Sequence, residues 1–73
     1  MKKAIYSKQH KTLTTRLKAA RIQCGLSQIQ VSKILETTQS HISKIESGQR
    51  RLDIIQLKVF AKLYKKELIS FVP

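Results

Sequence analysis

Apolar residues recur at intervals of three and four positions through most of the chain, which is the spacing of one face of an α-helix. The first stretch of this kind predicts a helix of four to five turns, with Ser7 as its N-cap and Gly25 just after its end. A shorter helix that begins at Thr12, with residues 1–11 as a loose arm, is the alternative interpretation. The expected inward positions are Tyr6, His10, Leu13, Leu17, Ala20 or Arg21, and Cys24 as a small core residue.

A short helix follows, opened by Ser27 and running to about Leu35. Ser27 and Gln30 have the spacing of a capping box, in which each side chain bonds the backbone of the other residue. Leu26 and Val31 have the spacing of a hydrophobic staple across the same helix start. The positions expected to be buried in this helix are Val31, Ile34 and Leu35.

A second short helix is predicted after a turn at residues 36–37. Thr38 is its expected N-cap, Ile42 and Ile45 are spaced to face inward, and Gly48 ends it. Polar side chains gather where this helix begins. Such a helix start can present backbone N–H groups to phosphate and side chains to base edges in the major groove of DNA.

Two further helices are predicted in the C-terminal third of the chain. Asp53 and Gln56 form a second capping box, and Leu52 and Leu57 form a second staple. The helix that follows has Leu57, Phe60, Ala61 and Tyr64 on one face. A last short helix, from about Lys66 to Val72, adds Leu68, Phe71 and Val72. Five helices without a credible strand predict an all-α fold, a compact five-helix bundle.

The chain is strongly basic, and its charge is unevenly distributed. It has 73 residues, with 15 Lys and Arg against four Asp and Glu, for a net charge of +11. Residues 1–11, 12–24 and 49–73 carry +4, +3 and +4, whereas residues 25–48 sum to zero. Positive flanks around a neutral, hydrogen-bonding segment suit a DNA binder, because phosphate contacts position a protein and base contacts give specificity. An anionic membrane is a second class of partner. No apolar run exceeds three residues, so no segment is expected to span a membrane. Binding to a membrane surface is not expected either, because the basic residues are not confined to the polar face of one amphipathic helix.

The sequence offers little chemistry beyond binding. A single cysteine, Cys24, excludes an intramolecular disulfide and a cysteine-rich zinc site, which suits a reducing cytoplasm. The two histidines and four acids form no nucleophile, catalytic dyad or metal-ligand spacing. We therefore expect a cytoplasmic protein with no enzymatic activity, no cofactor, no metal and no small-molecule ligand.

Two consecutive motifs stand out in the central segment: Leu26-Ser27-Gln28-x-x-Val31-Ser32-x-x-Leu35 and Gln39-Ser40-x-Ile42-Ser43-Lys44-Ile45-Glu46-Ser47-Gly48. Together they resemble the helix-turn-helix family of lambda-type repressors and Cro, also called XRE-like, and the resemblance covers about Leu13 to Val72. The continuation to Asp53 is similar to a bacterial and phage regulator subgroup that carries ESGxRRLD. The family's usual alanine is Ser32 here, whose hydroxyl would then bond a helix carbonyl. Glu36 and Lys65 stand where the family usually has a glycine in a turn, so a left-handed backbone is expected at Glu36.

The resemblance implies a role for each polar residue around the second short helix. In the family that helix lies in the major groove, and the helix before it crosses the DNA backbone. Base contacts are implied for Gln39, Ser40 and Lys44, although Lys44 could instead reach a phosphate or remain solvated. An ion pair between Arg21 and Glu46 would tie the reading helix to the rest of the domain. Phosphate contacts are implied for Ser27, Gln28, Ser43, Arg50 and Arg51.

The most specific interpretation is a transcriptional regulator of bacterial or phage type that binds a palindromic DNA site as a homodimer. Repression is favoured over activation. Residues 1–11 form a basic N-terminal segment that enters the first helix, and residues 12–73 form the DNA-binding domain. One short helix reads only a few base pairs, so two-fold pairing is expected, through Leu68, Ile69 and Phe71. The alternative is an antitoxin-like module whose DNA binding is secondary to a protein partner. Such proteins usually carry an extra tail or strand, and this chain ends soon after its last predicted helix.

Overall fold

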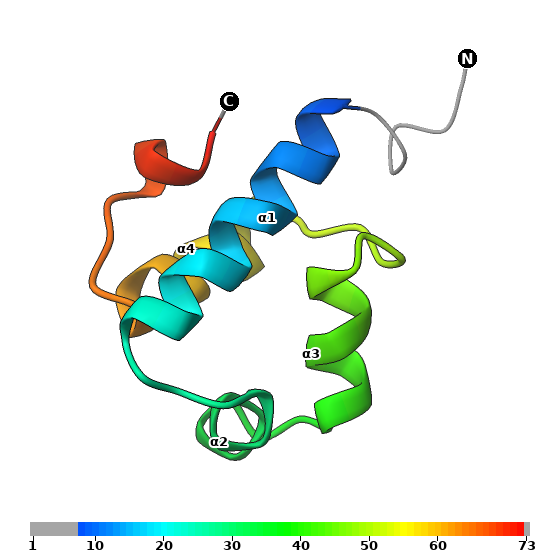
Figure 1. Ribbon diagram of the computed structural model, residues 1–73, viewed down its shortest axis with the longest axis vertical. Helices are drawn as coiled ribbons and strands as arrows, with labels where there is room; N and C mark the ends of the chain where they lie inside the picture. The colour runs from blue at the N-terminus through cyan, green and yellow to red at the C-terminus, as the bar shows by residue number, and fades with distance from the viewer. Residues whose placement is uncertain (1–7, 73) are drawn as a thin grey trace.

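Residues 8–72, which the computed structural model describes, form four α-helices and one short 3-10 helix (Figure 1). The elements are α1 (Lys8–Gln23), α2 (Gln28–Ile34), α3 (Gln39–Glu46), α4 (Ile54–Leu63) and the 3-10 helix η2 (Leu68–Phe71). α3 packs against α1 and α2, and η2 packs against α1 and α4. This part of the chain contains no β-strand, so the all-α prediction is confirmed.

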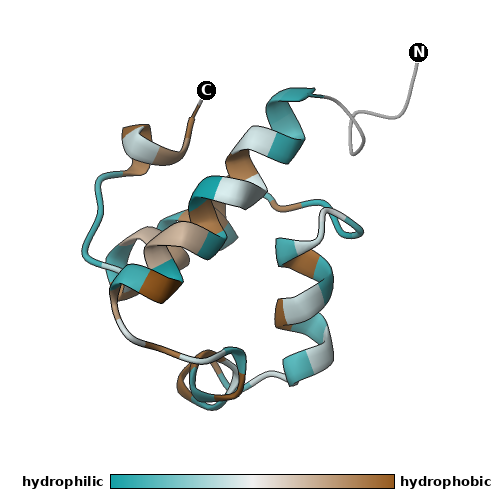
Figure 2. Cartoon of the chain, in the orientation of Figure 1, coloured by the Kyte–Doolittle hydropathy of each residue, from teal (hydrophilic) through white to brown (hydrophobic). Residues whose placement is uncertain are grey.

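One hydrophobic core joins all five elements. Each helix carries both apolar and polar residues, so its apolar residues can face this core while its polar residues face the solvent (Figure 2). The inward face predicted for the fourth helix is confirmed at every position. The buried core residues are Leu17, Ala20, Val31, Ile42, Ile45, Leu57, Phe60, Ala61, Tyr64 and Phe71. No helix within residues 8–72 has both the length and the apolarity needed to cross a membrane.

The longer of the two predicted forms of the first helix is the one observed. α1 already includes Lys8, and Thr12 lies inside it rather than at its start. Gly25 follows the helix with φ +73°, the left-handed conformation that glycine adopts without a steric penalty. Two of the predicted positions, the inward Tyr6 and the N-cap Ser7, lie outside the described residues.

The predicted helix caps are present at α2, α3 and α4. Each cap satisfies a backbone N–H group that has no partner inside its own helix. At α2 and α4 the reciprocal bond is made too, because a glutamine side chain accepts from the N-cap backbone N–H. The capping bonds are Gln30 N to Ser27 Oγ at 3.0 Å, His41 N to Thr38 Oγ1 at 3.1 Å and Gln56 N to Asp53 Oδ1 at 2.8 Å.

The structure accommodates the three departures from the family pattern, two in turns and one inside α2. Glu36 and Lys65 both have φ +57°, so each places an L-residue in the left-handed region at the end of a helix. Ser32 is buried at 5% exposure, and its hydroxyl donates to the carbonyl of Ile29 at 2.7 Å. The expectations for Glu36 and Ser32 are therefore both confirmed.

Two predictions of burial are wrong. Cys24 is exposed rather than part of the core, although its backbone N–H still bonds the carbonyl of Ala20 and its Sγ donates to the carbonyl of Tyr64 at 3.3 Å. Ile34 is 53% exposed, although its neighbour Leu35 packs against the core. In a helix as short as α2 one face is buried. Val31 and Leu35 share it at a spacing of four, and Ile34 lies about 80° from the middle of that face.

The last element is shorter than the sequence predicts. A helix was expected from about Lys66 to Val72, whereas η2 is a single 3-10 turn of four residues. Its Phe71 side chain inserts into the core at 1% exposure. The end of the turn is held to α1, since Arg16 Nη1 donates to the carbonyl of Val72 at 3.0 Å.

Candidate nucleic-acid interface

α3 presents a polar stripe on the side away from the core. Its inward residues, Ile42 and Ile45, are each 1% exposed. Because side chains three or four residues apart share a helix face, the exposed positions of α3 lie together on the outside. These exposed residues are Gln39, Ser40, Ser43 and Lys44. The structure thus brings the three predicted base-reading residues onto one face.

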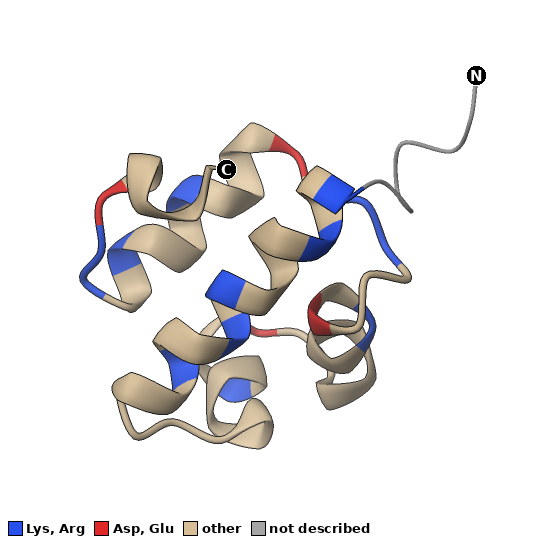
Figure 3. Ribbon diagram, turned by 45° about the horizontal axis from the view of Figure 1, so that its top comes forward, with Lys and Arg blue, Asp and Glu red and all other residues tan. Residues whose placement is uncertain are grey.

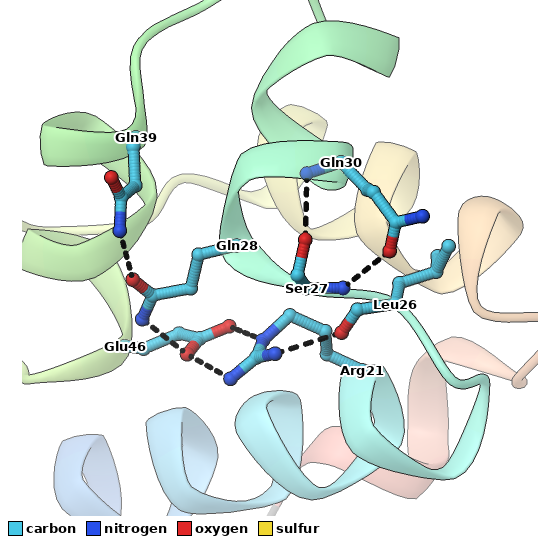
Figure 4. A network of polar contacts seen from close by, with 7 residues as sticks. All are labelled: Arg21, Leu26, Ser27, Gln28, Gln30, Gln39 and Glu46. Atoms are coloured by element: carbon cyan, nitrogen blue, oxygen red, sulfur yellow. Dashed lines mark hydrogen bonds and ion pairs between the residues drawn. The ribbon is translucent and has the colours of Figure 1, made fainter.

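Side-chain hydrogen bonds lead from this stripe into the domain (Figure 4). Gln39 Nε2 donates to Gln28 Oε1 at 3.3 Å, and Gln28 Nε2 donates to Glu46 Oε1 at 3.1 Å. Gln28 opens α2 and is half-buried, so its amide bridges the starts of α2 and α3 to the end of α3. Both ends of the Gln28 amide are engaged, which fixes its orientation.

The chain of bonds ends on the predicted ion pair. Arg21 Nε donates to Glu46 Oε2 at 2.7 Å, and Arg21 Nη2 donates to Glu46 Oε1 at 3.2 Å. Arg21 Nη1 also donates to the carbonyl of Leu26 at 2.8 Å. The two side chains are 11% and 4% exposed, so the pair is largely removed from water. Two parallel charge-assisted bonds are strong and directional, and here they join α1 to α3.

The loop between α3 and α4 adds positive charge next to the polar stripe. The backbone N–H groups of Gln49 and Arg50 donate to the carbonyl of Lys44, and Gly48 has φ +85°, so the helix ends in a Schellman-type cap and the loop turns away from the α3 axis. Arg50 and Arg51 are exposed there. Figure 3 shows basic residues in this loop and along α1 and α4. Ser27 is exposed as well, and its hydroxyl accepts the capping bond while keeping its own proton.

Comparison with known proteins agrees with this geometry. A helix-turn-helix family model matches residues 17–71, which is most of the chain. The chain belongs to the lambda-repressor-like helix-turn-helix family. This family binds DNA and is not enzymatic. No curated protein sequence gives a significant match.

Two solved structures resemble this lambda-repressor-like domain closely in their fold. The DNA-binding domain of BldD is 26% identical with a TM-score of 0.82, over 92% of this chain and 97% of that one. The S. venezulae BldD DNA-binding domain is 26% identical with a TM-score of 0.81, over 92% of this chain and 100% of that one. The fold predicted from the sequence, a helix-turn-helix domain of this family, is therefore confirmed.

One residue predicted at the dimer interface of this lambda-repressor-like domain is buried inside the domain instead. Phe71 is 1% exposed and belongs to the core of its own protomer, because η2 packs against α1 and α4. It cannot contribute interface area while η2 stays folded. Leu68 is partly buried against the same core, whereas Ile69 is 72% exposed and Val72 is 45% exposed.

Sequence reasoning missed the bridging role of Gln28. The residue was expected to contact phosphate, and nothing in the sequence indicated that its side chain meets both Gln39 and Glu46. The available signal was that Gln28 and Gln39 each occupy the first position of a helix in the same motif. Helix starts that lie side by side bring such side chains together, but only packing of α2 on α3 shows that they do.

Proposed function

We propose that this chain is a sequence-specific transcriptional repressor whose α3 reads the major groove of DNA. The observation that carries the proposal is the state of Gln39, which is exposed at the start of α3 and yet bonded to Gln28. Gln28 is in turn bonded to the buried carboxylate of Glu46. A side chain ordered before binding loses less conformational freedom on binding, which favours both affinity and specificity.

Gln39 keeps the groups that an adenine contact uses. Its Nε2 donates one hydrogen to Gln28, which leaves the second Nε2 hydrogen and the Oε1 oxygen. A bidentate contact with adenine needs one donor toward N7 and one acceptor for the N6 amino group. We therefore assign adenine to Gln39. Ser40 and Lys44 lie on the same face and are proposed to read neighbouring bases, with Lys44 directed to guanine.

The proposed phosphate contacts surround this reading face. Arg50 and Arg51 are exposed cations beside α3, and such charges bind the DNA backbone whatever its sequence. Ser43 is exposed on α3, and Ser27 keeps a hydroxyl proton to donate. Gln28 retains one Nε2 hydrogen after its bond to Glu46. The full proposed set is Ser27, Gln28, Ser43, Arg50 and Arg51.

The proposed functional form is a homodimer on a palindromic site in the cytoplasm. A single short helix contacts too few base pairs to select one site in a genome, and two-fold pairing doubles the contacts. Ile69, at 72% exposure, and Val72 beside it offer the apolar surface for this pairing. Occupying such a site would exclude the transcription machinery from it.

Selection of bound sequences from a randomised DNA pool tests this function. The expected product is a palindrome with half-sites about one helical turn apart. Gln39→Ala should relax the preference at one base position per half-site, at a cost of about 1–3 kcal/mol on the selected site. Arg51→Ala should instead weaken selected and random DNA alike, because it removes a phosphate contact.

Gln23→Ala is the matched control, since Gln23 is an exposed glutamine at the end of α1 that lines a hollow with Lys66 and Phe71 and with no residue of α3. It should bind like the wild type. If selection from the randomised pool enriches no sequence, the proposed function is refuted. Identical losses for Gln39→Ala and Arg51→Ala on both kinds of DNA would overturn the assigned roles.

A further inference from the structure

The hollow beside Gln23 lies between α1 and the segment that leads into η2 (Figure 1). Its volume is about 180 Å³, several times the space that one water molecule needs. The buried residues Ala20 and Phe71 form its base, and the exposed residues Arg16 and Lys66 stand at its rim. It therefore has room for one small polar group above an apolar floor.

The rim of this hollow is positively charged. Arg16 and Lys66 both line it, and none of its described lining residues is acidic. Neither cation forms an ion pair within residues 8–72. Two like charges around one hollow repel each other, and an anion between them replaces that repulsion with two attractions. The hollow thus favours an anionic ligand.

Arg16 is held in place for such a ligand. Its Nη1 donates to the carbonyl of Val72 at 3.0 Å, a bond between residues 56 positions apart. The guanidinium group has further N–H donors beyond this one, in a planar fork that matches the oxygens of a phosphate or carboxylate. A side chain that is ordered before binding loses less conformational freedom when the ligand arrives.

Lys66 reaches the rim because of the turn that ends α4. Lys65 has φ +57°, a left-handed conformation that is unfavourable for an L-residue. The backbone N–H of Lys66 then donates to the carbonyl of Ala61 at 2.9 Å, which fixes the turn. Backbone strain of this kind is found preferentially at binding sites. The two cations thus come from segments that are each held by a hydrogen bond.

We propose that this hollow binds the phosphate group of a small phosphate ester between Arg16 and Lys66. A phosphate monoester carries a charge of about −1.5 to −2 at neutral pH, which matches the two cations, whereas a carboxylate offsets only one. DNA is a less suitable source of the phosphate, because α1 separates η2 from α3 in both views (Figures 1 and 3). Arg21, which bonds α3, lies about 140° around α1 from Arg16.

A ligand in this hollow ties η2 to α1. It contacts both segments only while the turn is docked, so it stabilises the docked turn. That turn also presents Ile69, which is 72% exposed. Ligand and second copy then favour the same state, and each strengthens the binding of the other. This consequence rests on the proposed function, whereas the binding site does not.

Titration with inorganic phosphate at constant ionic strength, followed by amide NMR, tests the site. We expect saturating shifts that are confined to residues around the hollow, and weaker binding of acetate. Arg16→Gln and Lys66→Gln should each raise the Kd for phosphate about three- to tenfold. Shifts that do not saturate, or that spread evenly over the exposed cations, would overturn the proposal. So would equal shifts of these residues when the selected duplex is added, because DNA would then occupy the hollow.

Lys18→Gln is the matched control, because it lowers the net charge equally at an exposed position of α1 that does not line the hollow. It should leave the Kd for phosphate unchanged. A loss equal to that of Lys66→Gln would mean that a chain of net charge +11 attracts anions in general, which refutes the site.

Sedimentation with and without phosphate decides the consequence for assembly. Phosphate should increase the proportion of two-chain complexes on the palindromic duplex, and Lys66→Gln should abolish the increase. An unchanged proportion would refute the coupling. If the wild type forms no two-chain complex at all, the proposed homodimer fails, while the NMR titration still decides the binding site.

Discussion

Replacing Arg21 with Met should destabilise the domain by about 3–5 kcal/mol, the usual cost of removing one partner from a buried ion pair. The change removes both bonds to Glu46 and the bond to the Leu26 carbonyl. It leaves a carboxylate with a side chain that is 4% exposed and has no countercharge. A domain of 73 residues has a total stability of about 4–11 kcal/mol, so this single change should remove much or all of it.

Urea unfolding followed by circular dichroism measures this loss. Lys18→Met likewise replaces a cation with methionine, at an exposed position of α1, and should alter the stability by no more than about 0.5 kcal/mol. The double variant Arg21→Met/Glu46→Leu should recover part of the loss, because the unpaired buried charge is gone. A loss below about 1 kcal/mol for Arg21→Met, or a double variant weaker than the single one, would refute this view of the pair.

Three further predictions concern salt, assembly and pH. If each protomer neutralises about four to six phosphates, the logarithm of the dimer's DNA affinity should fall against the logarithm of salt concentration with a slope of about −7 to −11, and a slope near zero in filter binding would exclude DNA as the partner. Ile69→Glu should reduce the two-chain complex on a palindromic duplex to single chains in sedimentation, and an unchanged complex would rule out this interface. Because the folded-state pKa of Tyr64 is raised above 10.0, its contribution to stability is complete below that pH and is lost as pH rises further, which ultraviolet titration of Tyr6→Phe can follow.

Local chemistry explains why much of the fold could be predicted from the sequence. The capping bonds of Ser27, Thr38 and Asp53 each join residues three positions apart. Such contacts depend on spacing alone, so helix starts were predicted well. The left-handed backbone of Glu36 was predicted because the family resemblance marks that position as a turn.

Packing between elements explains what could not be predicted. The exposure of Ile34 depends on which face of α2 meets the core, and helical spacing in a seven-residue helix leaves that choice open. The sequence predicts Phe71 at the dimer interface, yet η2 turns this side chain into the core of its own chain, where it is 1% exposed. The bond of Gln28 to Glu46 joins residues 18 positions apart, so it follows from tertiary structure alone.

The two left-handed turns at Glu36 and Lys65 bear on how long this protein persists in a cell. An L-residue in that conformation costs about 1–2 kcal/mol. Compared with the same domain without this strain, two such positions together raise the unfolded population at least about tenfold, since each 1.4 kcal/mol is a factor of ten. Proteases act on the unfolded population, so a small domain with these turns is degraded faster than one with glycine there. For a regulator, faster degradation shortens the time for which control of a gene outlasts synthesis of the protein.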